Sequence, residues 1–190
     1  MKTTSSYLIS DLMQRTEANL RLVLELQKFS ENDLKHRPSA GAWSALECIE
    51  HLNFYGNYYV PEIEKQIDAS LYPATEFFKS GLLGNYFAKS MLPTEGSKKM
   101  KTLKSSNPLG KQLDKKEVMD KFIEHQQKLL QLLKKAKKVN LSRTKTGISI
   151  SNLIKLRLGD TFRVVIYHNQ RHLLQAQKAL DTIDRTSVNI

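Results

Sequence analysis

Two histidines, His168 and His172, stand four residues apart in the last strongly amphipathic segment of the chain. On an α-helix, residues at this spacing lie one above the other, about 40° and about 6 Å apart. Two imidazoles placed in this way can bind the same metal ion. A third histidine, His51, lies in another amphipathic segment far upstream. Three neutral imidazoles with an open position form the ligand set of a hydrolytic or Lewis-acid metal centre. The competing interpretation is that the pair at this spacing is incidental.

The elements that must position these residues are predicted by hydrophobic periodicity. Long amphipathic helices are expected over residues 5–28, 44–67, 114–138 and 160–183. Residues 75–92 indicate a shorter helix broken by two glycines, and a basic insertion follows at about 93–113. We expect irregular structure from residue 140 to 151 and a short turn at 151–157. The pattern predicts an all-α fold: a four-helix bundle with a long crossover and a short extra helix between helices 2 and 3.

The helix that carries His51 has a well-defined beginning. Ser44 and Glu47 have the spacing of a capping box, in which each side chain bonds the backbone amide of the other residue. Trp43 and Cys48 occupy the positions of a hydrophobic staple around it, so we expect Cys48 to be a buried thiol rather than a nucleophile. His51 lies at the edge of the apolar face of its helix, and so do His168 and His172. This equivalent placement favours a shared site.

Composition narrows the class of protein. With 190 residues, 40% hydrophobic and 26% charged, the chain is expected to form one globular domain over residues 1–190. A single cysteine excludes an internal disulfide and a cysteine-based zinc site, and it favours the cytoplasm. We see neither a signal-peptide pattern nor an apolar run of about 20 residues, so no membrane partner is expected.

The net charge of +11 is concentrated in one segment. Residues 97–145 contain 15 Lys and Arg against 4 Asp and Glu, which gives 15 − 4 = +11. Such a Lys-rich segment supports an alternative function, namely a non-catalytic protein that binds nucleic acid or another anionic partner. Aromatic residues that could stack on bases are missing from Leu92 to Lys121. We therefore expect a solvated basic segment and no nucleic-acid partner.

Two stretches resemble the DinB-like superfamily. Residues 38–52, PSAGAWSALECIEHL, are similar to the segment of that family in which Pro, Gly, Trp-Ser and a final His-Leu recur. Leu158-Gly159-Asp160, followed by His168, Arg171, His172 and Gln175, is similar to the last helix of the family. The order and separation of the stretches also fit, so the resemblance covers nearly the whole chain and is weakest over residues 68–113.

The resemblance implies a four-helix bundle in which His51, His168 and His172 hold a divalent transition metal, often zinc or nickel. Members include bacillithiol and mycothiol S-transferases and a mycothiol-dependent maleylpyruvate isomerase, and dimers are frequent. It therefore implies a metal-dependent transferase or hydrolase acting on a small-molecule substrate, with a low-molecular-weight thiol as cosubstrate and a homodimer as the assembly. No residue pattern identifies the thiol.

Other polar residues are secondary candidates. Tyr55, Tyr58 and Glu47 lie within about 40° of His51 around the helix, so they can line the site or support His51. Packing for the tyrosines and capping for Glu47 are the competing interpretations. His36, in a loop, and His125, among polar helical residues, are expected to be surface histidines.

Overall fold

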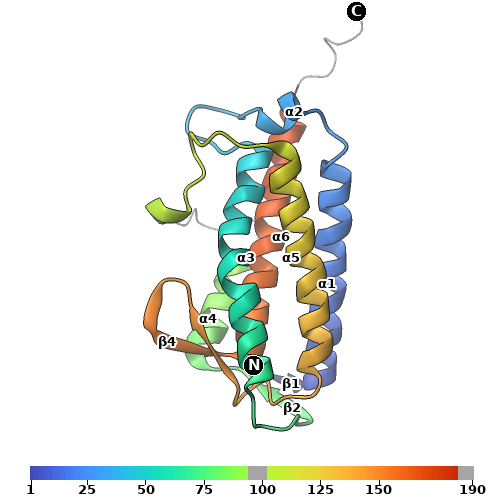
Figure 1. Ribbon diagram of the computed structural model, residues 1–190, viewed down its shortest axis with the longest axis vertical. Helices are drawn as coiled ribbons and strands as arrows, with labels where there is room; N and C mark the ends of the chain where they lie inside the picture. Colours follow the sequence, from blue (N-terminus) through green and yellow to red (C-terminus); the bar gives the residue numbers. More distant parts are fainter. Residues whose placement is uncertain (94–101, 184–190) are drawn as a thin grey trace, which may run out of the picture.

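The computed structural model describes residues 1–93 and 102–183. Four long helices lie side by side in it (Figure 1): α1 (Ser5–Leu26), α3 (Ala45–Asp68), α5 (Lys115–Ala136) and α6 (Leu158–Asp181). The shorter elements are α2 (Glu31–Lys35), α4 (Leu82–Met91) and a 3₁₀ turn, η1 (Lys104–Ser106). The prediction of an all-α fold is confirmed in part, since the protein is mainly helical but also contains short strands. The long helices agree with the predicted ranges to within a few residues.

The core lies between the long helices. α3 packs against both α5 and α6, and α1 packs against the same two helices. One cluster of fully buried side chains includes Leu12, Ile63 and Phe162, and a second includes Leu46, Phe122 and Leu173. Burial of these apolar faces is the main stabilising contribution, since amphipathic helices of this length depend on tertiary packing.

Two short antiparallel strand pairs accompany the helices. β1 (Lys2–Thr4) pairs with β2 (Phe77–Lys79), and β3 (Lys145–Ile148) pairs with β4 (Ser151–Arg157) in a hairpin. The predictions of helix at residues 77–79, irregular structure at 145–148 and a turn at 151–157 are therefore wrong. The inward side chain of β3 at position 146 is a threonine, whose hydroxyl bonds that of Thr161 at 2.6 Å. A polar inward residue removes the apolar alternation by which a strand is recognised.

The beginning of α3 confirms the predicted capping box. The backbone amide of Glu47 donates to Oγ of Ser44 at 3.2 Å, and the amide of Ser44 donates to Oε2 of Glu47 at 2.9 Å. Because the cap determines where the helix begins, it also determines the direction in which His51, seven residues after Ser44, leaves the helix.

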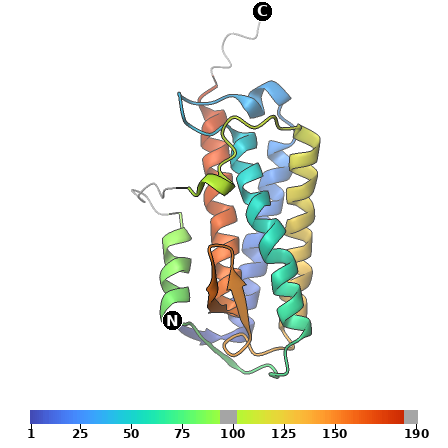
Figure 2. The same ribbon diagram turned by 60° about the vertical axis from the view of Figure 1, so that its left-hand side comes forward.

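The short helix α4 is bound to α6 near both of its ends (Figure 2). At its beginning, the amide of Gly81 donates to Oδ2 of Asp160 at 2.8 Å, and Asp160 forms a fully buried ion pair with Arg163 at 3.0 Å. Near its end, Nη1 of Arg171 donates to the carbonyl oxygen of Ser90 at 2.9 Å. This pair of attachments places the end of α4 beside the two histidines of α6.

Candidate metal centre

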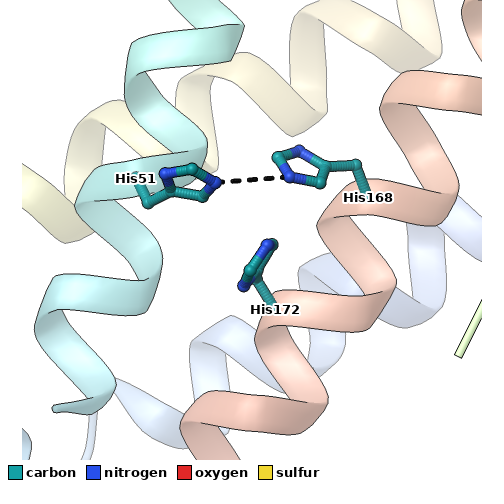
Figure 3. Close-up of side chains that lie close together, drawn as sticks. All are labelled: His51, His168 and His172. Carbon is teal, nitrogen blue, oxygen red and sulfur yellow. Dashed lines mark hydrogen bonds between the residues drawn. The ribbon is translucent and has the colours of Figure 1, made fainter. Parts of the chain in front are cut away.

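Three histidines from two helices converge beside α4. His51 on α3 faces His168 and His172 on α6 (Figure 3), and a ring nitrogen of each lies within 4.8 Å of those of the other two. The ring centroids are 4.6 to 5.1 Å apart. The structure thus brings together all three residues that the sequence singled out, in an arrangement that can hold a metal ion.

The separation of two of the nitrogens fits a metal. Nε2 of His51 and Nε2 of His168 are 3.3 Å apart. Two imidazole nitrogens bound to a tetrahedral zinc ion, each about 2.0–2.1 Å from it, would be about 3.3 Å from one another. In the metal-free protein, the two Nε2 atoms at this separation share an N–H···N hydrogen bond, which a bound metal would replace.

The outer nitrogens of two rings have acceptors that orient them. Nδ1 of His51 donates to the backbone carbonyl of Ser106 at 2.8 Å, and Nδ1 of His172 donates to Oε1 of Gln175 at 2.9 Å. Since these oxygens only accept hydrogen bonds, the proton of each neutral ring belongs on Nδ1. The Nε2 lone pairs are then directed toward the shared centre, which is the arrangement that supports metal ligands.

The surroundings keep the three rings neutral. Burial lowers the pKa of His51. Burial, together with the neighbouring His172 and His51, lowers the pKa of His168 well below its usual value. Burial and the nearby His51 lower the pKa of His172 to about 3. Metal binding at neutral pH therefore does not need to displace protons from imidazolium groups.

An open cleft of about 410 Å³ adjoins the histidines. Its other walls are formed by Trp43, Tyr55, Met91, Thr102 and Arg171, with Gly41, Ala42 and Gln175 at the side. The Trp43 ring packs 4.7 Å from the ring of His51 and 5.7 Å from that of His172. No carboxylate lines the cleft within residues 1–93 and 102–183, and the open side leaves room for a ligand from solvent or substrate.

Of the three secondary candidates, only Tyr55 contacts the histidines; Glu47 and Tyr58 do not. Tyr55 contacts the rings of His51 at 5.0 Å and His168 at 4.8 Å, and its hydroxyl lies 3.3 Å from Oγ of Ser106. Glu47 caps α3 and pairs with Arg37. Tyr58 instead packs toward Gly147 of the hairpin, outside the cleft lining.

Several parts of the site were not predicted. Trp43 was assigned only a packing role, and neither the carbonyl of Ser106 nor Met91 was a candidate. Trp43 sits just before the capped helix start, one residue from Ser44, so its position at the site follows from the cap. Ser106 contacts His51 through its backbone carbonyl and lies in the segment between α4 and α5. A backbone contact of this kind cannot be read from residue types.

The remaining histidines and the cysteine have structural surroundings. Cys48 is fully buried, as predicted, and burial raises the pKa of its thiol. His36 is exposed. The prediction for His125 is wrong, because its ring is partly buried against Gly56 on α3, and burial lowers its pKa. Glycine at position 56 has no side chain and so leaves room for that ring.

Several lysines of the Lys-rich segment have partners among the described residues. Lys98, Lys99 and Lys101 lie outside those residues. On α5, Lys116 pairs with Asp120, Lys135 pairs with Glu64 at 2.9 Å, and Lys115 donates to the carbonyl of Phe29. Two of these lysines are therefore paired with carboxylates, and the third is bonded to a backbone carbonyl.

These features define a mainly helical protein with a candidate three-histidine metal centre between two of its long helices. The profile of the DinB superfamily matches residues 12–176, and the chain belongs to that superfamily. Comparison with curated proteins and with solved structures gave no significant match. None of the described helices is long and apolar enough to span a membrane.

Proposed function

We propose that the protein is a four-helix-bundle metalloprotein in which His51, His168 and His172 hold one divalent transition metal, zinc or nickel. The observation that carries the proposal is the convergence of three neutral imidazoles on one point beside an open cleft. The 3.3 Å separation of two Nε2 atoms and the acceptors of the two outer nitrogens support it.

We further propose metal-dependent transfer or hydrolysis on a small substrate, with a low-molecular-weight thiol as the nucleophile in the transferase case. When bound, the metal supplies Lewis acidity, which lowers the pKa of a coordinated thiol or water to near neutrality. Trp43 and Met91 give the cleft an apolar, polarisable wall on which an apolar part of the substrate can pack. The guanidinium of Arg171 adds a positive charge that favours an anionic nucleophile. With no described carboxylate in the cleft lining, the released proton passes to solvent.

Metal analysis of protein purified without a histidine tag tests the metal site. We expect close to one equivalent of metal, and loss of uptake in His168→Ala. His36→Ala is the matched control, because it removes an exposed histidine outside the site and should leave uptake unchanged. Less than about 0.2 equivalents after incubation with zinc and nickel, or unchanged uptake in His168→Ala, would overturn the proposal.

The activity is tested separately on metal-loaded protein. Thiol consumption should be followed with a panel of low-molecular-weight thiols and an electrophile, and hydrolysis with simple esters. We expect turnover that disappears in His168→Ala and on chelation. Stoichiometric metal without turnover of any thiol or ester would reject the enzymatic proposal and leave the metal site standing.

The family resemblance also supports a homodimer as the working form, and the single cysteine favours the cytoplasm as its compartment. Sedimentation equilibrium of the metal-loaded protein checks the assembly, and a monomer throughout the micromolar range would contradict it.

A further inference from the structure

A second cavity of about 410 Å³ lies at the other end of α4, away from the histidines. It is bordered by the beginning of α4, the β3–β4 hairpin and the beginning of α6, which lie side by side (Figure 2). Asp160 borders this cavity, and His172 lies twelve residues further along α6, about 18 Å away at the rise of an α-helix. The two cavities are therefore separate.

The lining of this second cavity is strongly basic. Four cationic side chains border it, from Arg143, Lys145, Lys155 and Arg157. Arg143, Lys145 and Lys155 are exposed, and Arg157 is half-buried. One acidic residue, Asp160, is in the lining, but its carboxylate is buried and already paired with Arg163. Asp160 therefore does not neutralise the four cations.

The hairpin holds three of these cations on one face. Lys145 on β3 is the direct cross-strand partner of Arg157 on β4, and Lys155 precedes Arg157 by two residues. Directly opposed residues in an antiparallel pair, and residues two apart on a strand, project on the same side. Like charges placed directly opposite one another destabilise a strand pair. A bound anion between them would remove that repulsion.

Two cations are held in place by other contacts. Nη1 of Arg157 donates to the backbone carbonyl of Lys79 at 2.6 Å. The guanidinium of Arg143 stacks 4.1 Å from the ring centre of Tyr72. A guanidinium that is held in position loses less freedom when it binds an oxyanion, so its bonds to that anion are more favourable.

The cavity also has an apolar side. Leu82 and Leu83 at the beginning of α4 border it with 97% and 44% of their surfaces exposed, and Tyr72 is 40% exposed. A multiply charged oxyanion attached to an apolar or ring-containing body would contact both sides. The concave shape and limited volume favour a compact ligand over an extended polymer.

We infer that the cavity bounded by Arg143, Lys145, Lys155 and Arg157 is a binding site for a phosphate group. Phosphate suits it because the charge of the group, close to −2 at neutral pH, matches several converging cations, and its oxygens accept bonds from guanidinium and ammonium groups at once. The phosphate can belong to a small phosphorylated metabolite or to a lipid headgroup. This inference does not depend on the proposed metal function.

Titration calorimetry with pyrophosphate as the probe tests the inference on the purified full chain. We expect saturable binding that persists in His168→Ala, which separates the site from any metal at the histidines. The variant Lys145→Gln/Lys155→Gln should weaken binding by about tenfold or more, because it removes two of four cations. The matched control Lys134→Gln/Lys178→Gln removes two exposed lysines elsewhere and should bind like the unmodified protein.

A titration with sodium chloride at matched ionic strength controls for non-specific electrostatic heat. A second titration with vesicles that contain phosphatidic acid tests a lipid headgroup as the ligand. Binding to pyrophosphate in solution supports a soluble ligand, whereas binding only to vesicles that contain phosphatidic acid, lost in Lys145→Gln/Lys155→Gln, supports a lipid headgroup. The inference is overturned if neither probe binds, if sodium chloride reproduces the heat, or if both double variants lose affinity equally. Thermal unfolding of each variant verifies that it is folded.

Discussion

The backbone carbonyl of Ser106 accepts a hydrogen bond from Nδ1 of His51 at 2.8 Å, across a separation of 55 residues. Ser106 is the last residue of η1, in the long connection between α4 and α5. The connection thus supplies the contact that selects the tautomer of the first histidine. For His172, the corresponding acceptor is the side chain of Gln175. This contact can therefore be removed by mutation.

Replacing Gln175 should weaken metal binding without removing a ligand. In Gln175→Ala, the proton on Nδ1 of His172 loses its acceptor, so we expect zinc affinity to fall by about 10–100-fold. Gln175→Glu keeps an acceptor and should bind more tightly than Gln175→Ala. Competition with a chromophoric chelator measures both. Gln177→Ala, which removes an exposed amide on the same helix, is the control, and equal affinities for Gln175→Ala and Gln177→Ala would refute the supporting role.

The fluorescence of the chain's single tryptophan should report metal binding. Because the ring of Trp43 lies 4.7 Å from that of His51, a quenching ion held by His51 would be close to the indole. Titration of metal-free protein with nickel should lower the emission with a break at one equivalent. His36→Ala should behave in the same way, whereas His168→Ala should show no break. A break that survives in His168→Ala would place the quenching site elsewhere.

The metal-free protein should lose stability as the pH falls below neutrality. Burial lowers the pKa of His172 to about 3 and that of His168 well below 6.5, whereas histidines of the unfolded chain titrate near about 6.5. Between those values the unfolded chain binds more protons, so the free energy of unfolding decreases as pH falls through about 6.5 and is level above it. Urea midpoints at several pH values check this. His168→Gln should flatten the dependence, and a midpoint that rises on acidification would contradict the assignment.

Alanine at position 56 should destabilise the protein, contrary to its usual effect in a helix. Replacing an exposed helical glycine by alanine normally contributes about 1 kcal/mol of stability. Here a Cβ at position 56 would lie 2.2 Å from Nδ1 of His125, so the ring must move and we expect a loss of about 1–3 kcal/mol. In a His125→Ala background the same change should cost less or become stabilising. Chemical denaturation of the four proteins measures this coupling, and additive effects would mean that the contact does not matter.

Much of the fold and the three candidate ligands could be predicted because the signals are local and periodic. The cap at Ser44 and Glu47 and the apolar faces that carry His51 and His168 are visible within single helices, and the structure confirms them. The equivalent placement of the histidines at the edge of two apolar faces favoured a shared site, and the family resemblance supported the same three residues. Periodicity succeeds here since these helices bury one face each.

The parts that could not be predicted depend on contacts between distant segments. β2 is recognisable only through its pairing with β1, over 70 residues away, and β3 buries a threonine instead of an apolar residue. His125 looked solvated because its neighbours in sequence are polar, while the residue that shields it, Gly56, belongs to another helix. The acceptor at Ser106 is a main-chain atom, which no residue type reveals.

The two attachments of α4 have a consequence for how the metal cleft opens. A helix of ten residues is too short to be stable alone, so α4 stays folded through its bonds to Asp160 at one end and Arg171 at the other. We therefore expect local unfolding of α4 to cost less free energy than global unfolding, and it would remove Met91 from the cleft wall. We expect amide exchange to be faster in α4 than in the long helices that carry the histidines. Opening of the cleft would then not require those long helices to separate.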